Sequence, residues 1–479
     1  MPPGTNPPAR GRSGAGRPTL SRRRLLQAGV GAVAASAVRA LPAGAGPSPK
    51  KAGPNVLLVM TDQQHIATIA ARGCRHAKTP GLDGLCRRGV TFMESHSTYP
   101  LCSPARSSLW TSRMPSETGV YRNGRPIHDS IPNIGQWFRQ HTDYETVYVG
   151  KWHLPGSFTH AVPGFTVLTP GVDGQGNLGD TSTSLACEGY LRRRSKDRPF
   201  LMVASFFQPH DICQWLRLNQ TDPGRLRYGE LADDLPPLPA NFEYDRNEPA
   251  RLRTQRDRNE SGSTKGNWSP LHWRYYRWAY YRHIEMVDAE IGRLLNALEQ
   301  TGHAAGTLVV FTSDHGEGLG HHQMVRKSSF YDAAEKVPMI VAYPGHVRAD
   351  VVDADHLVSG LDVVPTVCDY VGIEPPAHVR GRSLRPLLEG RDTAWRTYVA
   401  AELSDARMIR TRRYKYVVYR GDPVEQLFDR QADPGETRNL AGQATMATVL
   451  AEHRAMLRQW ERGLRPAPGL PKDAQWPRT

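Results

Sequence analysis

The chain has 479 residues, of which 39% are hydrophobic, and a formal net charge of +14 at pH 7. This length can bury a large core, and we expect one large domain and one smaller one. Residues 1–51 carry seven Arg and two Lys but no Asp or Glu, so the remainder has a net charge of only 14 − 9 = +5. Such a mild excess suits an acidic substrate, and we expect no nucleic-acid partner.

The N-terminal segment has the pattern of a targeting sequence. Residues 21–26 read Ser-Arg-Arg-Arg-Leu-Leu, and a weakly apolar run and Ala-Gly-Ala follow at residues 28–38 and 43–45. Residues 1–45 therefore resemble a twin-arginine export signal, which implies passage of the folded chain through the twin-arginine translocase to the periplasm or the exterior. The run is shorter than the ~20 apolar residues that span a bilayer, so we expect no permanent membrane anchor. A disordered basic tail is the alternative.

Four apolar runs follow, and each ends in a polar turn. They occupy residues 55–60, 145–149, 200–204 and 307–311, and the turns after them contain Asp62, Lys151, His210 and Asp314. Continuous apolar runs predict strands buried on both faces of a parallel sheet. An apolar stripe with helical spacing, from Ile284 to Leu298 and followed by Gly302, predicts a helix before the last strand. We therefore predict an α/β domain whose strand-end turns converge on one crevice.

Residues 211–275 interrupt the alternation with many Pro, Asn, Arg and Asp and little periodicity, so we expect a long excursion beside the crevice. An aromatic cluster follows, and we expect most of it to pack at the start of the long helix, with a substrate pocket as the alternative. Its members are Trp268, Trp273, Tyr275, Tyr276, Trp278, Tyr280 and Tyr281.

The C-terminal part reads as a small subdomain. Residues 381–388 close the large domain, and short strands are predicted at residues 397–402, 408–410 and 414–419. We expect an antiparallel sheet with a terminal helix, and place the catalytic α/β domain at residues 52–390 and the α+β subdomain at residues 391–479.

The six cysteines show no close pair with metal-site spacing, so no zinc site is indicated. They are Cys74, Cys86, Cys102, Cys187, Cys213 and Cys368. Their pairing cannot be read from the sequence, and the oligomeric state is not indicated.

Residues 102–106 read Cys-Ser-Pro-Ala-Arg, which places a proline just inside a predicted helix start. The free N–H groups at such an end bind anions, and the guanidinium of Arg106 could donate to the oxygens of a tetrahedral oxyanion at Cys102. The alternative is a buried structural cysteine beside a surface arginine.

Residues 102–113 resemble the sulfatase signature, Cys-x-Pro-Ser-Arg followed by Leu-x-Thr-Gly-Arg, with Ala105 and Ser112 as departures. Further motifs of that family recur in order up to residues 426–440, so the chain is identified as a member of the formylglycine-dependent (type I) sulfatases. The resemblance implies an alkaline-phosphatase-like fold with a mostly parallel sheet flanked by helices. It also implies that a formylglycine-generating enzyme oxidises Cys102 to the nucleophile. Five cysteines would then remain, enough for at most two disulfides.

The resemblance also implies a metal site. Its ligands would be Asp62, Gln63, the modified Cys102, Asp314 and His315, with Ca²⁺ as the ion and Mg²⁺ as the alternative. Gln63 stands where many members have a second Asp, so the site loses one negative charge.

The remaining implied roles concern catalysis. Hydrated formylglycine would attack sulfur in line, while Arg106, Lys151 and Lys327 offset the charge on the equatorial oxygens. His210 would protonate the leaving oxygen, and His153 would then take the proton of the second hydroxyl to release sulfate.

The expected activity is hydrolysis of a sulfate ester or sulfamate of a small or carbohydrate substrate. The same scaffold could instead cleave a phosphonate monoester or phosphodiester. A third possibility is a non-catalytic protein that binds an anionic sugar with Cys102 unmodified.

Overall fold

The computed structural model describes residues 53–172, 176–220, 229–262, 268–471 and 476. The predicted export signal, residues 1–45, lies outside this part. No helix within the described ranges has the length and apolar character needed to cross a membrane. All six cysteines are free thiols.

An eight-stranded sheet with the order β5-β4-β6-β1-β7-β8-β2-β9 forms the large domain. Its strands are β1 Asn55–Asp62, β2 Val90–Phe92, β4 Glu145–Gly150, β5 Thr166–Thr169, β6 Phe200–Pro209, β7 Thr307–Ser313, β8 Met339–Ala342 and β9 Val351–Asp353. The five strands from β5 to β7 are parallel, and β8 is antiparallel to both of its neighbours. The mostly parallel sheet is as predicted, and the four predicted strands are adjacent at its centre.

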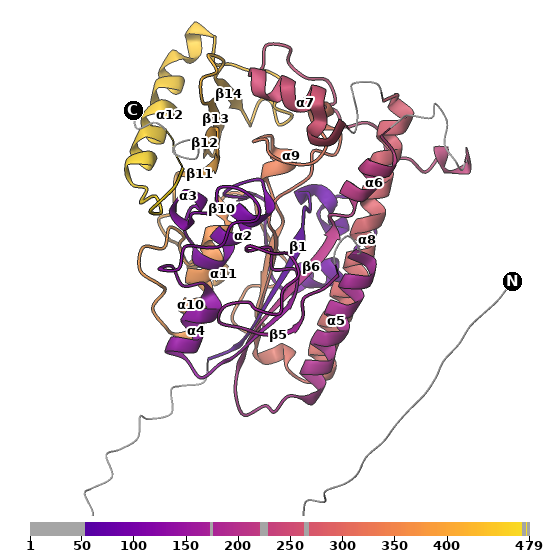
Figure 1. Cartoon of the computed structure of the whole chain (residues 1–479), viewed down its shortest axis with the longest axis vertical. Coiled ribbons are helices and arrows are strands. Elements are labelled where there is room, and N and C mark those ends of the chain that lie inside the picture. Colours follow the sequence, from indigo (N-terminus) through magenta and orange to yellow (C-terminus); the bar gives the residue numbers. More distant parts are fainter. Residues whose placement is uncertain (1–52, 173–175, 221–228, 263–267, 472–475, 477–479) are drawn as a thin grey trace, which may run out of the picture. The chain divides into compact units, whose positions relative to one another are not determined.

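Helices cover both faces of this sheet (Figure 1). One face packs against α1 Pro80–Arg88, α5 Gly176–Arg193 and α8 Pro270–Gln300, and the other against α2 Cys102–Thr111, α4 Ile134–His141 and α10 Val363–Val371. Along β1, Val56 and Leu58 belong to one core and Leu57 and Val59 to the other. Burial on both faces explains why the strand is apolar at every position.

The excursion at residues 211–275 contains more helix than predicted. It includes α6 Ile212–Leu218 and α7 Ala250–Gly262 before α8 begins. α7 has no apolar stripe; it buries Leu252, and the Arg256 guanidinium forms a buried ion pair with Glu248. A helix held in this way gives no periodic signal in the sequence.

The aromatic cluster does pack, as predicted. Trp268, Trp273, Tyr276 and Tyr280 are buried in one apolar core with Ile212 and Leu216 of α6.

A second sheet forms the C-terminal part, with β11 Tyr398–Leu403, β12 Ala406–Thr411, β13 Tyr414–Tyr419 and β14 Gln426–Asp429 antiparallel in chain order. Leu450 and Leu457 of α12 Ala447–Arg462 pack on Ile409 and Tyr416 of this sheet. The antiparallel sheet and terminal helix are confirmed, with β14 as an unpredicted fourth strand. The domain boundary predicted at residue 390 falls between α11 and β11 and stays a prediction.

The remaining short elements connect these layers. They are β3 Ser95–His96, which pairs with β10 Val358–Ser359, and the helices α3 Pro115–Thr118, α9 Asp332–Glu335 and α11 Arg385–Leu388.

Candidate active site

The register of the central strands brings the polar turns together. β1 lies between β6 and β7, with Asp62 opposite Pro209 and Thr61 opposite Ser313. His210 comes directly after Pro209 of β6, and Asp314 comes directly after Ser313 of β7. Both residues therefore lie next to Asp62 at the end of β1. The predicted convergence at the carboxyl ends of the strands is therefore observed.

Cys102 reaches this crevice from the first turn of α2. Its side chain is buried, and the preceding Leu101 is extended, so the helix begins at Cys102 with Pro104 in its first turn, as predicted. The Ser103 N–H donates to Asn123 Oδ1 at 3.0 Å, and the Ser103 hydroxyl donates to the carbonyl of His153. These contacts anchor the start of the helix beside the strand ends.

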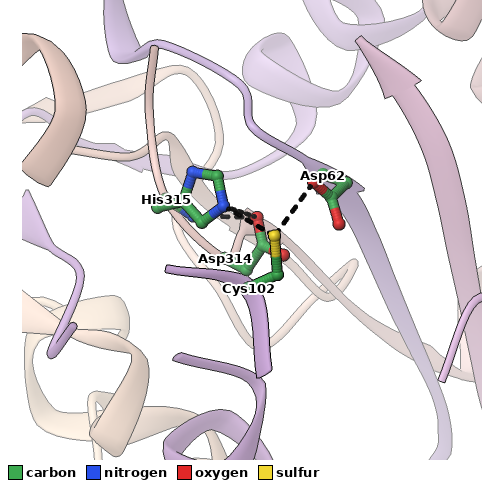
Figure 2. Close-up of side chains that lie close together, drawn as sticks. All are labelled: Asp62, Cys102, Asp314 and His315. Carbon is green, nitrogen blue, oxygen red and sulfur yellow. Dashed lines mark hydrogen bonds and ion pairs between the residues drawn. The ribbon is translucent and has the colours of Figure 1, made fainter. Parts of the chain in front are cut away.

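Four side chains meet around the Cys102 sulfur. Sγ lies 3.2 Å from Nε2 of His315 and 3.8 Å from Oδ1 of Asp62, and Asp314 completes a group whose ligand atoms all lie within 4.8 Å of one another. Figure 2 shows the four side chains pointing toward a common centre. All four are buried.

Arg106 bridges two carboxylates of the site. Its guanidinium is completely buried and donates to Oδ2 of Asp62 and Oδ2 of Asp314, both at 2.9 Å, while Nη1 donates to the Lys151 carbonyl and the Ser205 hydroxyl. These contacts use the Nε hydrogen, both Nη1 hydrogens and one of the two Nη2 hydrogens, and the predicted contact with substrate oxygens stays a prediction. The residue holds the two carboxylates in place.

His315 is oriented by its backbone neighbour. Its Nδ1 lies 2.9 Å from the carbonyl oxygen of Gly316, an acceptor, so Nδ1 carries a proton and Nε2 faces the cluster. Burial opposes protonation of His315, but Asp314 and Cys102 outweigh it and raise the pKa, so Nε2 would offer its lone pair to a cation on losing its proton. Arg106 binds Oδ2 of each carboxylate, and Oδ1 of Asp62 lies 3.8 Å from the Cys102 sulfur. Oδ1 of Asp314 lies 3.7 Å from Nε2 of His315 and also accepts hydrogen bonds from the backbone N–H groups of Gln63 and His315. Two carboxylate oxygens and one imidazole nitrogen are a fitting donor set for a divalent cation.

Gln63 and Lys327 lie on the other side of the sulfur. Lys327 Nζ donates to Oε1 of Gln63 at 2.6 Å and approaches Cys102 Sγ at 3.2 Å. The amide oxygen of Gln63 is therefore directed to the ammonium that also contacts Cys102, and an amide oxygen can serve as an additional ligand.

Lys151 is positioned by a glycine at the end of β4. Gly150 has φ +93°, and a Cβ there would collide with the Ser205 carbonyl. Nζ of Lys151 then reaches Oδ2 of Asp62 at 2.8 Å and lies over the ring of Phe207.

The two predicted proton-transfer histidines lie beside Cys102. Both His153 and His210 interact with the Cys102 side chain, and Nδ1 of His153 is buried with no hydrogen-bond partner among the residues that the structure describes. Burial and Lys151 lower the pKa of His210 to about 4, and burial also lowers the pKa of His153. All ten predicted site residues thus lie close together around Cys102, while their catalytic roles stay predictions.

Electrostatics favour an ionised sulfur. Burial and Asp62 oppose ionisation of Cys102, but Lys327, His315 and a hydrogen bond from His153 lower the pKa of the thiol well below its usual range. Burial, with Asp62 nearby, raises the pKa of Asp314 to about 6. A cation bound between the carboxylates would relieve this repulsion.

Several residues at the site were not identified from the sequence. Glu317 accepts a hydrogen bond from Gln63, Tyr280 donates to the Gln63 carbonyl, and Cys213 lies 3.4 Å from the Gln63 amide nitrogen. Only proximity in sequence could have indicated them, because Glu317 follows the Asp-His-Gly turn and Cys213 follows His210 by one helical turn.

Comparisons with known proteins agree with this geometry. Residues 54–373 match the family model described as Sulfatase, and residues 320–463 match the model described as N-sulphoglucosamine sulphohydrolase, C-terminal. A Δ4,5-hexuronate-2-O-sulfatase from Bacteroides thetaiotaomicron is 32% identical over 84% of this chain and 88% of its own length.

Solved structures are similar over most of their length. A 2-O GAG sulfatase superposes with a TM-score of 0.77 at 31% identity, covering 86% of this chain and 94% of that one. A phosphonate monoester hydrolase of Agrobacterium radiobacter gives a TM-score of 0.72 at 26% identity, covering 86% and 96%.

Proposed function

The chain belongs to the sulfatase family, and from its site we propose that it hydrolyses sulfate esters of an acidic saccharide through a formylglycine formed at Cys102, with Ca²⁺ bound beside it. The main observation in support is the position of Cys102 Sγ among Asp62, Asp314 and His315. This sulfur stands in for the oxygen atoms of formylglycine. When present, formylglycine supplies a hydrated aldehyde as nucleophile and the cation supplies Lewis-acid stabilisation.

The side chains around this position have separate tasks. Lys327 and Lys151, with the N–H groups at the start of α2, offset the charge on the sulfate oxygens. Arg106 keeps the carboxylates of Asp62 and Asp314 in register.

Proton transfer falls to the two histidines beside Cys102. His210 donates to the oxygen of the leaving alcohol, and His153, whose buried Nδ1 has no hydrogen-bond partner within the described part of the chain, accepts a proton from the group at residue 102.

The substrate class follows from the relatives. Two of them are described as a Δ4,5-hexuronate-2-O-sulfatase and a 2-O GAG sulfatase. We therefore propose a 2-O-sulfated hexuronate as the first substrate to test. Glucosamine N-sulfate and choline sulfate complete the screen.

We further propose that a formylglycine-generating enzyme modifies Cys102 in the cytoplasm before the folded chain is exported by the twin-arginine route. This order is compatible with the Arg-Arg motif at residues 22–23, because the twin-arginine route carries folded proteins.

Mass spectrometry and turnover together test the proposal. In protein from the native host, the tryptic peptide of residues 89–106 should be lighter than its encoded mass by loss of H₂S and gain of one oxygen atom. Unmodified Cys102→Ser and Cys102→Ala should lose multiple turnover, because neither can form the geminal diol. Normal turnover of a sulfate ester by Cys102→Ala would overturn the proposal.

The similarity to a phosphonate monoester hydrolase supports a second candidate, because a tetrahedral anion, a cation and in-line displacement serve both reactions. Rates on matched aryl sulfate and aryl phosphonate monoesters separate the two. A higher kcat/KM on the phosphonate would favour the second candidate.

A further inference from the structure

The side-chain amide of Gln63 lies between two groups of opposite chemistry. On one side, Lys327 Nζ, which can only donate, is 2.6 Å from Oε1. On the other side, Nε2 donates to Oε2 of Glu317. Reversing the amide would place its NH₂ against the ammonium and its oxygen against the carboxylate. Both neighbours therefore specify one orientation, with the carbonyl oxygen toward Lys327, whose ammonium also lies 3.2 Å from the Cys102 sulfur.

Glu317 is itself held firmly. Its side chain is completely buried, and Oε1 accepts hydrogen bonds from the Tyr276 hydroxyl and from the backbone N–H of Arg326. The Leu319 N–H lies 3.5 Å from the same oxygen. These donors are neutral groups, and they engage Oε1, so Oε2 is directed to Gln63. The orientation of the Glu317 carboxylate is thus fixed by contacts that do not involve Gln63.

We infer that Glu317 is a positioning residue for the cation site: it fixes the amide of Gln63 so that oxygen, not NH₂, faces the cation. This inference rests on the proposed Ca²⁺ site. Asp at position 63 would need no such partner, since both carboxylate oxygens are equivalent ligands. Gln has only one oxygen that can coordinate, so the chain needs a residue that selects its orientation.

An isosteric variant tests this orientation directly. In Glu317→Gln, the two donors at Oε1 select the new amide oxygen for that position, so the new NH₂ takes the place of Oε2. That NH₂ faces Gln63 and favours the reversed amide, which turns the Gln63 NH₂ toward the cation. We expect Ca²⁺ affinity to fall about 10- to 100-fold, as when a group that orients a metal ligand is lost.

The reciprocal exchange should restore binding. In the double variant Gln63→Glu/Glu317→Gln, the residue-63 carboxylate accepts from the residue-317 NH₂ with one oxygen and offers the other to the cation. Ca²⁺ affinity should return to within a few-fold of the unchanged protein. Gln63→Glu alone places two carboxylates against each other and should bind less well than the double variant.

Isothermal titration of the chelator-treated full chain with Ca²⁺ alone provides the readout, without substrate turnover. Glu374→Gln is the matched control, because it makes the same exchange at an exposed glutamate; its affinity should be unchanged. This inference alone would be overturned if Glu317→Gln bound Ca²⁺ as well as the unchanged protein does. It would also be overturned if the double variant Gln63→Glu/Glu317→Gln did not recover the lost Ca²⁺ affinity. Failure of the unchanged protein to bind Ca²⁺ would overturn it together with the metal assignment.

Discussion

Arg106 and Asp62 form an ion pair that is completely buried, with Nη2 of the guanidinium 2.9 Å from Oδ2 of the carboxylate. Nε of the same guanidinium makes the equivalent contact with Asp314. The single guanidinium group therefore holds two carboxylates that would otherwise repel each other. The remaining oxygen of Asp62 lies 3.8 Å from the Cys102 sulfur, and that of Asp314 accepts backbone hydrogen bonds from Gln63 and His315.

Replacing Arg106 by Lys tests this bridging role. A single ammonium cannot present the planar fork that reaches both carboxylates, so their relative position should relax. We expect kcat/KM to fall about 100-fold, which is the cost of a displacement near 1 Å in an active site. Rates are compared at saturating Ca²⁺, with the exposed Arg122→Lys as control. Unchanged kcat/KM in Arg106→Lys would contradict the role.

Removal of the cation should weaken both activity and stability. With the ion absent, Asp62 and Asp314 repel across the cluster. A ligand that binds only the folded state stabilises it by about 2.7 kcal/mol at 100 times its Kd.

The melting temperature should therefore rise with added Ca²⁺ and fall with chelator, measured by calorimetry. Asp314→Asn should lose most of this dependence, whereas the exposed Asp129→Asn should keep it. A melting temperature independent of Ca²⁺ in the unchanged protein would argue against the site.

The strand ends were the part of the molecule that the sequence predicted best. Asp62, Lys151, His210 and Asp314 each follow a continuous apolar run, and parallel strands bring such turns to one edge. The motif at residues 102–106 then supplied the nucleophile position. Local patterns sufficed because each residue lies next to the element that positions it.

Contacts between distant segments could not be predicted in this way. Glu317 acts on Gln63 across 254 residues of sequence, and the role of Arg106 depends on two carboxylates from different strands. Both roles depend on which hydrogen-bonding groups are already paired, and only the folded geometry determines this pairing.

Lys415 connects the C-terminal sheet to the loop that carries the metal ligands. Its ammonium is buried between Asp332 and Glu436, 2.6 Å from the latter. α9, which begins at Asp332, accepts backbone hydrogen bonds from Gly316 and Glu317 through the carbonyls of residues 334 and 333.

Lys415→Met removes this cation from the buried Glu436 and the half-buried Asp332, both of which still contact Arg430. The free energy of unfolding should therefore fall by about 3 kcal/mol, the lower end of the cost of breaking a buried ion pair. Chemical denaturation measures the loss. Lys196→Met on the surface should change stability by less than about 0.5 kcal/mol. A similarly small effect at Lys415 would show that the ion pairs do not contribute.

His96 should make stability depend on pH. It is buried, its Nδ1 lies 2.9 Å from both oxygens of Glu335, and its Nε2 lies 3.3 Å from Glu94, which also pairs with Lys336 and Arg410. Burial lowers the pKa of His96, but the carboxylates of Glu335 and Glu94 outweigh it, so the pKa lies above its ordinary value of 6.5.

Because the folded state binds this proton more tightly than the unfolded state, the stabilisation is complete below about pH 6.5 and disappears as the pH rises through the folded-state pKa. The unfolding free energy of the unchanged protein minus that of His96→Gln should therefore be larger at about pH 6 than at about pH 9. Denaturant titrations at both pH values measure the difference, with the exposed His160→Gln as control. A difference that grows with pH would mean that His96 is neutral in the folded state.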